Sequence, residues 1–281
     1  MMKFRKKPLL SSLVLLVLII LFHKLPLNLF FINIGFNQYH SESYDKIITN
    51  FIIIIILSLL KNIKIPFRLF SPNFNKLQYY LPLILYIVVY SGGFKDFFNF
   101  DFSSISFSLL FTYILKYFSS SFLEEFIFRG FILGIFVLNF PKTRIGIFKS
   151  VALSGLIFGL MHIINLWTFE GQTIKGVLNQ VYATSCFGIM YGATYLKTRS
   201  ILILGILHFA SNFFSMINEL EFIELVNNSV AMSDKSLINI IISEIFRIVI
   251  FGIPLIIGLI LIYNTDEKDV NKLTYENQNV A

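Results

Sequence analysis

Long apolar runs separated by short polar segments dominate the chain. Because a membrane-crossing helix needs about 20 apolar residues to span about 30 Å of hydrocarbon, runs near that length predict membrane helices. About eight such runs occur, at 8–31, 45–60, 77–92, 104–139, 145–166, 177–196, 200–217 and 237–263. The first is interrupted by Pro26. The fourth is too long for one crossing, and we expect it to tilt, protrude or kink around Ser119, Ser120 and Ser121.

Composition supports a membrane protein rather than a soluble globule. Hydrophobic residues make up 56% of the chain, Phe occurs 33 times and the mean hydropathy is +0.75. The sequence therefore predicts an all-α, polytopic membrane helix bundle with the lipid bilayer as a partner. The single cysteine, Cys186, cannot form an internal disulfide and is expected to be a buried apolar residue.

The positive charges follow the pattern of a membrane topology. Although the net charge is +7, the basic residues fall in short clusters between the apolar runs, so membrane orientation explains them better than nucleic-acid binding. With the N-terminus inside, the inner segments hold fifteen of the 23 Lys and Arg residues and the outer segments five. Both termini are therefore expected in the cytoplasm. No small-residue cleavage pattern follows the first run, which favours a membrane helix or signal anchor over a secretory signal.

Three ionisable side chains, Glu124, Glu125 and Arg129, lie inside the fourth apolar run. Charged groups at bilayer depth are costly unless they are paired or face a polar interior, so they indicate a functional site. On a helix Glu125 and Arg129 share a face, whereas Glu124 is rotated away from them. We expect Glu125 to pair with Arg129 and Glu124 to face the neighbouring helices. The alternative is a structural ion pair beside one protonated, hydrogen-bonded carboxyl.

Two of the four histidines, His162 and His208, also lie within apolar runs. Phe158 and His162 share a helix face at i, i+4, and so do His208 and Asn212. Taken singly, each histidine is compatible with an ordinary interhelical hydrogen bond. A catalytic site is favoured when the residues are taken together, because two histidines, an aligned Asn and an unpaired Glu lie on three different runs.

These residue types suit peptide-bond hydrolysis inside a membrane. Glu124 can take a proton from water, and one histidine can orient that water. The other histidine, beside Asn212, supplies donors for the oxyanion of a tetrahedral intermediate, worth about 3 kcal/mol per donor. Alternatively, Glu124, His162 and His208 form a two-His, one-carboxylate set for Zn²⁺. The His-Glu-x-x-His pattern of zincin proteases is missing, and both the zinc and the metal-free glutamate mechanism stay open.

Three motifs follow one another on three of the runs: Glu124-Glu125-x-x-x-Arg129, Phe158-x-x-x-His162 and His208-x-x-x-Asn212. Together they resemble the motifs of the CPBP intramembrane proteases, which comprise the CAAX prenyl endopeptidases of the Rce type and the bacterial Abi proteins. The resemblance implies membrane helices at 1–103, a CPBP/Abi-like catalytic core at 104–217, and an outer loop, a last helix and a polar tail at 218–281. It also implies a peptidase, which we expect in a bacterial cytoplasmic membrane.

The resemblance assigns a role to each matched position. By this resemblance the catalytic residues are Glu124, His162, His208 and Asn212, and the supporting residues are Glu125, Arg129 and Phe158. The first glutamate activates water with the second-motif histidine, and the third motif forms the oxyanion site. The substrate is expected to be a hydrophobic peptide or a membrane-protein segment.

The depth of Glu124 leaves the substrate open. It lies about 24 Å along its helix from Phe140, the expected inner end, whereas a prenylated cytosolic substrate would favour an inner site. Both CAAX-type cleavage and processing of bacteriocin or other leader peptides therefore remain possible. The alternative function is a non-proteolytic scaffold or bacteriocin self-immunity protein of the same fold. A proton-coupled transporter is disfavoured because the chain shows no repeated halves.

Overall fold

The computed structural model describes residues 7–59, 76–90, 93–168, 172–217, 220 and 237–265. Every regular element in these ranges is helical, and no strand occurs in them. The helices are α2 (Pro8–Phe22), α3 (Leu27–Asn33), α4 (Gln38–Leu59), α5 (Leu77–Tyr90), α6 (Gly93–Asn99), η3 (Phe102–Ser104), α7 (Phe107–Glu125), η4 (Phe126–Ile132), α8 (Leu133–Asn139), α9 (Arg144–Met161), η5 (His162–Ile164), α10 (Asn165–Thr168), α11 (Ile174–Thr198), α12 (Ile201–Ser215) and α14 (Leu237–Tyr263). The all-α prediction is therefore confirmed for the described part of the chain.

The helices follow the apolar runs. The first run breaks where Pro26 predicts, because α2 ends at Phe22 and α3 begins at Leu27. The short elements α6 and η3 are not predicted by the apolar pattern. Apart from Leu220, the expected outer loop at 218–236 lies outside the described residues, as does the tail beyond residue 265.

The fourth run forms one uninterrupted helical stretch from α7 through η4 to α8. Ser119, Ser120 and Ser121 all lie inside α7, which continues to Glu125. The tilt, protrusion or kink expected around them stays a prediction. The helix geometry changes in η4, which is a π-helix. Such wider turns occur frequently at functional sites, and this one begins directly after Glu125.

Four helices start after a Ser or Thr whose side chain accepts a hydrogen bond from a backbone N–H: Ser106 before α7, Thr143 before α9, Thr173 before α11 and Ser200 before α12. These caps satisfy N–H groups that have no partner inside the helix. Ser200 directly follows Arg199, which ends α11 with a left-handed φ of 60°. The starts of α7, α9, α11 and α12 are thus defined by local sequence.

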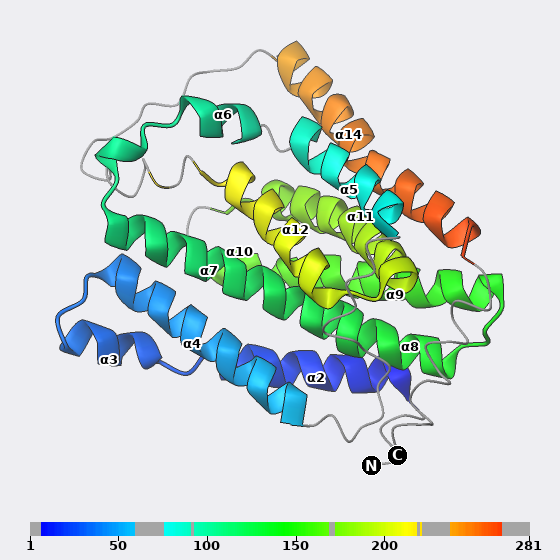
Figure 1. The fold of residues 1–281 in the computed structure, drawn as a ribbon, viewed down its shortest axis with the longest axis horizontal. Helices are drawn as coiled ribbons and strands as arrows, with labels where there is room; N and C mark the ends of the chain where they lie inside the picture. Colours follow the sequence, from blue (N-terminus) through cyan, green and yellow to red (C-terminus); the bar gives the residue numbers. More distant parts are fainter. Residues whose placement is uncertain are drawn as a thin grey trace. The chain divides into compact units, whose positions relative to one another are not determined.

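The helices form two compact units. The first comprises Met1–Phe70, Ile87–Ile135 and Ser200–Val226, and the second comprises Ser71–Tyr86, Phe136–Arg199 and Asn227–Ala281. In the first unit, α4 and α12 both pack against α7 (Figure 1). In the second unit, α9 and α14 both pack against α11. Each unit is therefore organised around one central helix.

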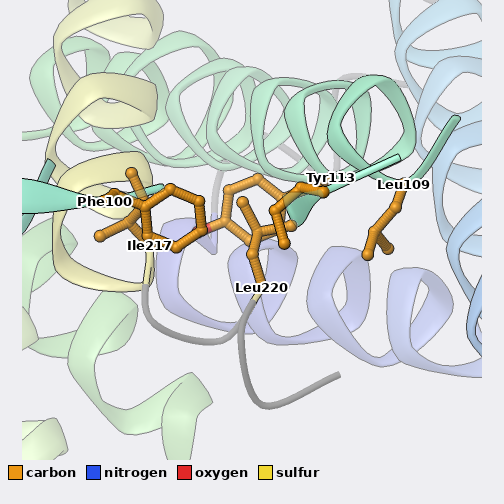
Figure 2. Close-up of a cluster of buried hydrophobic side chains, with 6 residues drawn as sticks. Phe100, Leu109, Tyr113, Ile217 and Leu220 are labelled. Carbon is orange, nitrogen blue, oxygen red and sulfur yellow. The ribbon is translucent and has the colours of Figure 1, made fainter. Parts of the chain in front are cut away.

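A cluster of buried side chains joins the start of α7 to the residues that follow α12. Figure 2 shows its members Phe100, Leu109, Tyr113, Ile217 and Leu220. The Tyr113 hydroxyl also donates to the Phe213 carbonyl oxygen at 3.4 Å. This apolar burial, together with the hydrogen bond, holds α12 against α7.

Glycines allow close contact between α9 and α11 in the second unit. A Cβ atom at Gly155 would lie 2.7 Å from the backbone nitrogen of Ile189, and one at Gly159 would lie 2.6 Å from the carbonyl oxygen of Val181. A Cβ atom at Gly188 would lie 2.8 Å from Cα of Gly155. Only glycine permits this separation of the two backbones, as in other membrane helix pairs.

The described helices have the apolar surface of a membrane protein. Two stretches, Pro8–Asn33 and Arg144–Trp167, are long and apolar enough to cross a bilayer. Shorter apolar helices occur at Leu77–Val89, Ile201–Ser215 and Ile248–Tyr263. Large apolar side chains are widely exposed, and Val89 and Phe107 reach 83% and 81%. Such a surface suits contact with lipid. The count of eight crossings stays a prediction.

Candidate active site

The first-motif residues lie at the junction between α7 and the π-helix η4. Glu125 is the last residue of α7, and Arg129 lies in η4. Arg129 Nε lies 2.9 Å from Glu125 Oε2, and the side chains of both residues are at most 1% exposed. The predicted Glu125–Arg129 pair is confirmed. Because both charges are buried, each needs the other to remain ionised at low cost.

Glu125 has a second partner that the sequence did not predict. Its Oε1 accepts a hydrogen bond from Nδ1 of His208, on α12, at 2.8 Å. One buried carboxylate thus contacts a guanidinium through one oxygen and an imidazole through the other. Nδ1 therefore carries the donated proton, and the other ring nitrogen of His208, Nε2, faces Glu124.

Glu124 differs from its neighbour in exposure and in contacts. Its Oε2 lies 3.7 Å from Nε2 of His208, which is too long for a direct hydrogen bond. The Glu124 side chain is 34% exposed, whereas that of Glu125 is 0% exposed. The two adjacent carboxylates therefore differ in their partners and exposure, as their different directions on the helix predict. Glu125 is held on both oxygens, and Glu124 is the accessible carboxylate beside the imidazole.

Asn212 lies one turn after His208 on α12 and also faces α7. Its Nδ2 donates to Oγ of Ser121 at 2.9 Å. A Cβ atom at Gly205 would lie 2.9 Å from Cδ2 of Phe122, so a glycine allows α12 to approach α7 closely beside the site. The predicted shared face of His208 and Asn212 is thus the face that packs on the first motif.

The second motif lies in the second compact unit. His162 directly follows α9, and its Nδ1 lies 3.0 Å from the carbonyl oxygen of Phe158. The two rings meet edge to face with centroids 5.2 Å apart. The Phe158 backbone and ring therefore both orient the imidazole, and Nε2 is again the nitrogen left for chemistry. That His162 acts together with Glu124 stays a prediction.

A second polar network lies on another face of α7. Asn50 of α4 donates to the hydroxyls of Ser119 and Ser120, each at 3.1 Å. His23 Nε2 lies 2.9 Å from Asn50 Oδ1. These residues tie the first helices to α7. This pairing was not predictable from the sequence, because Asn50 and Ser119 are 69 residues apart and neither belongs to a motif.

A zinc centre needs at least three protein ligands. Among the residues that the structure describes, no three His, Cys, Asp or Glu side chains gather in a group that could hold a metal ion. Within the first unit, His208 and Glu124 offer two donors, while His208 Nδ1 is already bound to Glu125. Within this unit the described residues therefore supply two of the three ligands, and the three-ligand set of Glu124, His162 and His208 stays a prediction.

Residues 106–214 match the family model described as Type II CAAX prenyl endopeptidase Rce1-like. The match begins at the cap of α7 and ends inside α12, so it includes all three motifs. No curated protein and no solved structure matches the chain. The match supports the CPBP/CAAX protease family for this segment, and the members of that family are integral membrane proteases. The family resemblance of the three motifs is thereby confirmed.

Proposed function

We propose that the chain is an intramembrane endopeptidase that cleaves a membrane-associated or hydrophobic peptide with water activated by Glu124. The observation that carries this proposal is the arrangement around His208, whose Nδ1 is bound by buried Glu125 and whose Nε2 faces accessible Glu124. The Rce1-like domain supports peptidase chemistry. Residues 104–217 form the catalytic core in this proposal.

The first step is the activation of water. A water molecule that contacts Glu124 gives a proton to the carboxylate, and its oxygen forms a bond to the carbonyl carbon of the substrate. His162 assists by accepting a hydrogen bond from this water through Nε2. The electron pair of the carbonyl bond moves onto oxygen, which produces a tetrahedral oxyanion.

Stabilisation of the oxyanion falls to His208 and Asn212. Nε2–H of a protonated His208 and an N–H of Asn212 donate to the developing negative charge. Glu125 holds the imidazole and offsets its positive charge, while Arg129 offsets the charge of Glu125. Glu124 then passes its proton to the amide nitrogen, and the carbon–nitrogen bond breaks to release an acid and an amine. These steps follow the metal-free alternative, and a Zn²⁺ site formed by Glu124, His162 and His208 is the other alternative.

The apolar surroundings of the site support a hydrophobic or membrane-associated substrate. The helices that carry the site present apolar side chains outward, which suits a peptide that arrives from the bilayer. We propose a protein with about eight crossings and both termini in the cytoplasm, as the charge pattern favours. CAAX-type substrates and leader peptides are the two candidate classes. A self-immunity or scaffold protein of the same fold is the alternative function.

Replacement of Glu124 by Gln tests the mechanism. Purified wild-type protein and Glu124→Gln are incubated in lipid with two peptide sets, one prenylated at a C-terminal cysteine and one hydrophobic without prenyl groups. Mass spectrometry identifies the products. We expect the wild type to cleave one set and Glu124→Gln to lose at least about 100-fold in kcat while remaining folded.

Glu42→Gln is the matched control, since Glu42 is an exposed carboxylate that accepts from Gln38 on α4. It should retain wild-type turnover. Wild-type turnover in Glu124→Gln would exclude the mechanism. If the protein protects cells from a toxin and this protection survives both Glu124→Gln and His162→Ala, the non-proteolytic alternative is supported instead.

A further inference from the structure

Ser121 lies on α7 one helical turn before Glu125 and on the same face of the helix. The two residues are four apart and share a helix face, as His208 and Asn212 do on α12. Glu125 binds His208, and Ser121 binds Asn212. The two helices therefore run antiparallel and are joined by two side-chain hydrogen bonds. Both His208 and Asn212 of the third motif thus form a hydrogen bond with a residue of α7.

Of the three consecutive serines Ser119, Ser120 and Ser121, Ser121 is the one that accepts a hydrogen bond from Asn212. Successive residues of a helix are rotated by about 100°, so Ser119 and Ser121 point to nearly opposite faces of α7. Ser119 accepts from Asn50 of α4, whereas Ser121 accepts from Asn212 of α12. Both hydroxyls belong to residues with 0% exposure. Ser119 therefore has the same chemistry and burial but faces away from the third motif.

Because a side-chain amide group is planar, a hydrogen bond from one of its N–H bonds also determines the direction of the other N–H bond and of the carbonyl oxygen. The Nδ2 group of Asn212 carries two N–H bonds in one plane, and Ser121 Oγ takes one of them. The second N–H then has a defined direction. A donor that is already oriented needs no reorganisation as negative charge develops, which is the condition for strong oxyanion stabilisation.

We propose that Ser121 is a positioning residue for the oxyanion site. Its hydroxyl holds the side chain of Asn212 so that the second amide N–H points to the substrate oxygen, as Glu125 holds His208. This inference rests on the proposed function and adds a residue outside the three motifs. Ser121 itself does not touch the substrate.

The test compares Ser121→Ala, Asn212→Ala and the double variant in the cleavage assay, with the full-length protein in lipid. We expect Ser121→Ala to reduce kcat about 10- to 100-fold with KM changed by less than about twofold, since a misplaced group costs turnover rather than binding. The double variant should be no slower than Asn212→Ala, because Ser121 acts only through Asn212. Wild-type kcat in Ser121→Ala, a loss confined to KM, or multiplied losses in the double variant would each overturn the proposal.

Ser119→Ala is the control for the loss of a buried hydroxyl on α7. It should retain kcat even if the melting temperature falls. Ser121→Cys keeps nearly the same volume but offers only a weak acceptor, so it provides the measurement if Ser121→Ala does not fold. We expect Ser121→Cys to lose kcat as well, and full turnover there would contradict the proposal.

The Glu124→Gln variant separates failure of this inference from failure of the proposed function. Full cleavage by Glu124→Gln would exclude the mechanism on which the inference rests. An inactive Glu124→Gln together with a fully active Ser121→Ala would leave the mechanism intact and exclude only the positioning role.

Discussion

Glu125 of α7 accepts a 2.8 Å hydrogen bond from His208 of α12, although the two residues are 83 positions apart in sequence. The same carboxylate contacts Arg129 through its other oxygen. One buried group thus joins the first and third motifs and leaves the accessible carboxylate, Glu124, for chemistry. The two adjacent glutamates thus differ in contacts and in exposure, as the proposed mechanism requires.

Removal of the Arg129 charge should strongly destabilise the protein. In Arg129→Met, Glu125 would keep a buried negative charge without its guanidinium, and loss of one partner of such a pair costs about 3–5 kcal/mol. In the double variant Glu125→Gln/Arg129→Met, much of this stability should return, while turnover should stay low because His208 lacks its carboxylate. Thermal unfolding in detergent and the cleavage assay measure the two effects. An Arg129→Met protein as stable as the wild type would contradict the role of the pair.

The polar network of Asn50 should support stability without supporting catalysis. In Asn50→Leu, the hydroxyls of Ser119 and Ser120 and the ring of His23 lose a buried partner. We expect a loss of about 1–3 kcal/mol in the free energy of unfolding and an unchanged kcat in the fraction that remains folded. Denaturant titration beside single-turnover kinetics tests this. A selective loss of kcat would show that the network reaches the active site.

The contact between α9 and α11 should be sensitive to one added methyl group. In Gly159→Ala the new Cβ would lie 2.6 Å from the Val181 carbonyl oxygen, so the two backbones must separate. We expect a loss of about 1–3 kcal/mol in the free energy of unfolding, together with reduced turnover, because His162 follows the same helix. The melting temperature and kcat are the measurements.

Gly252→Ala on α14 is the matched control. There the nearest atom to an added Cβ is the Tyr182 hydroxyl oxygen at 3.3 Å, which donates to the Ile248 carbonyl oxygen, so a shift of a few tenths of an ångström in one side chain relieves the contact without separating two backbones. This variant should melt close to the wild type. Equal effects of Gly159→Ala and Gly252→Ala would show that the α9–α11 contact has no special role.

Cleavage should survive removal of metal ions. The proposed steps use only carboxylate, imidazole and amide groups. Protein treated with a chelator and checked by elemental analysis should keep its kcat within about twofold of the untreated protein. Loss of activity on chelation, with recovery on addition of Zn²⁺, would support the zinc alternative.

The locations of the motifs were predictable because they depend on local properties of the chain. A charged residue inside an apolar run stands out wherever the helix packs, and a spacing of four residues places two side chains on one face in any α-helix. Glu125 with Arg129 and His208 with Asn212 follow from these rules alone. The helix caps at Ser106 and Ser200 likewise follow from residue type.

Contacts between helices did not follow from the sequence, and neither did the π-helix. The spacing of Ser119 and Ser121 places them on nearly opposite faces of α7, but it does not show which helix each face meets. The pairing of Glu125 with His208 and of Ser121 with Asn212 depends on the packing of α12 against α7.

The sequence by itself determined the helical class, the membrane character and the residues that we propose for the chemistry, because apolar run length and charge inside an apolar run are properties of one segment. Only the tertiary structure decided which glutamate is held and which is accessible, and which serine meets the third motif. That choice depends on how two helices distant in sequence meet, since a side chain's partner is set by packing rather than by its own segment.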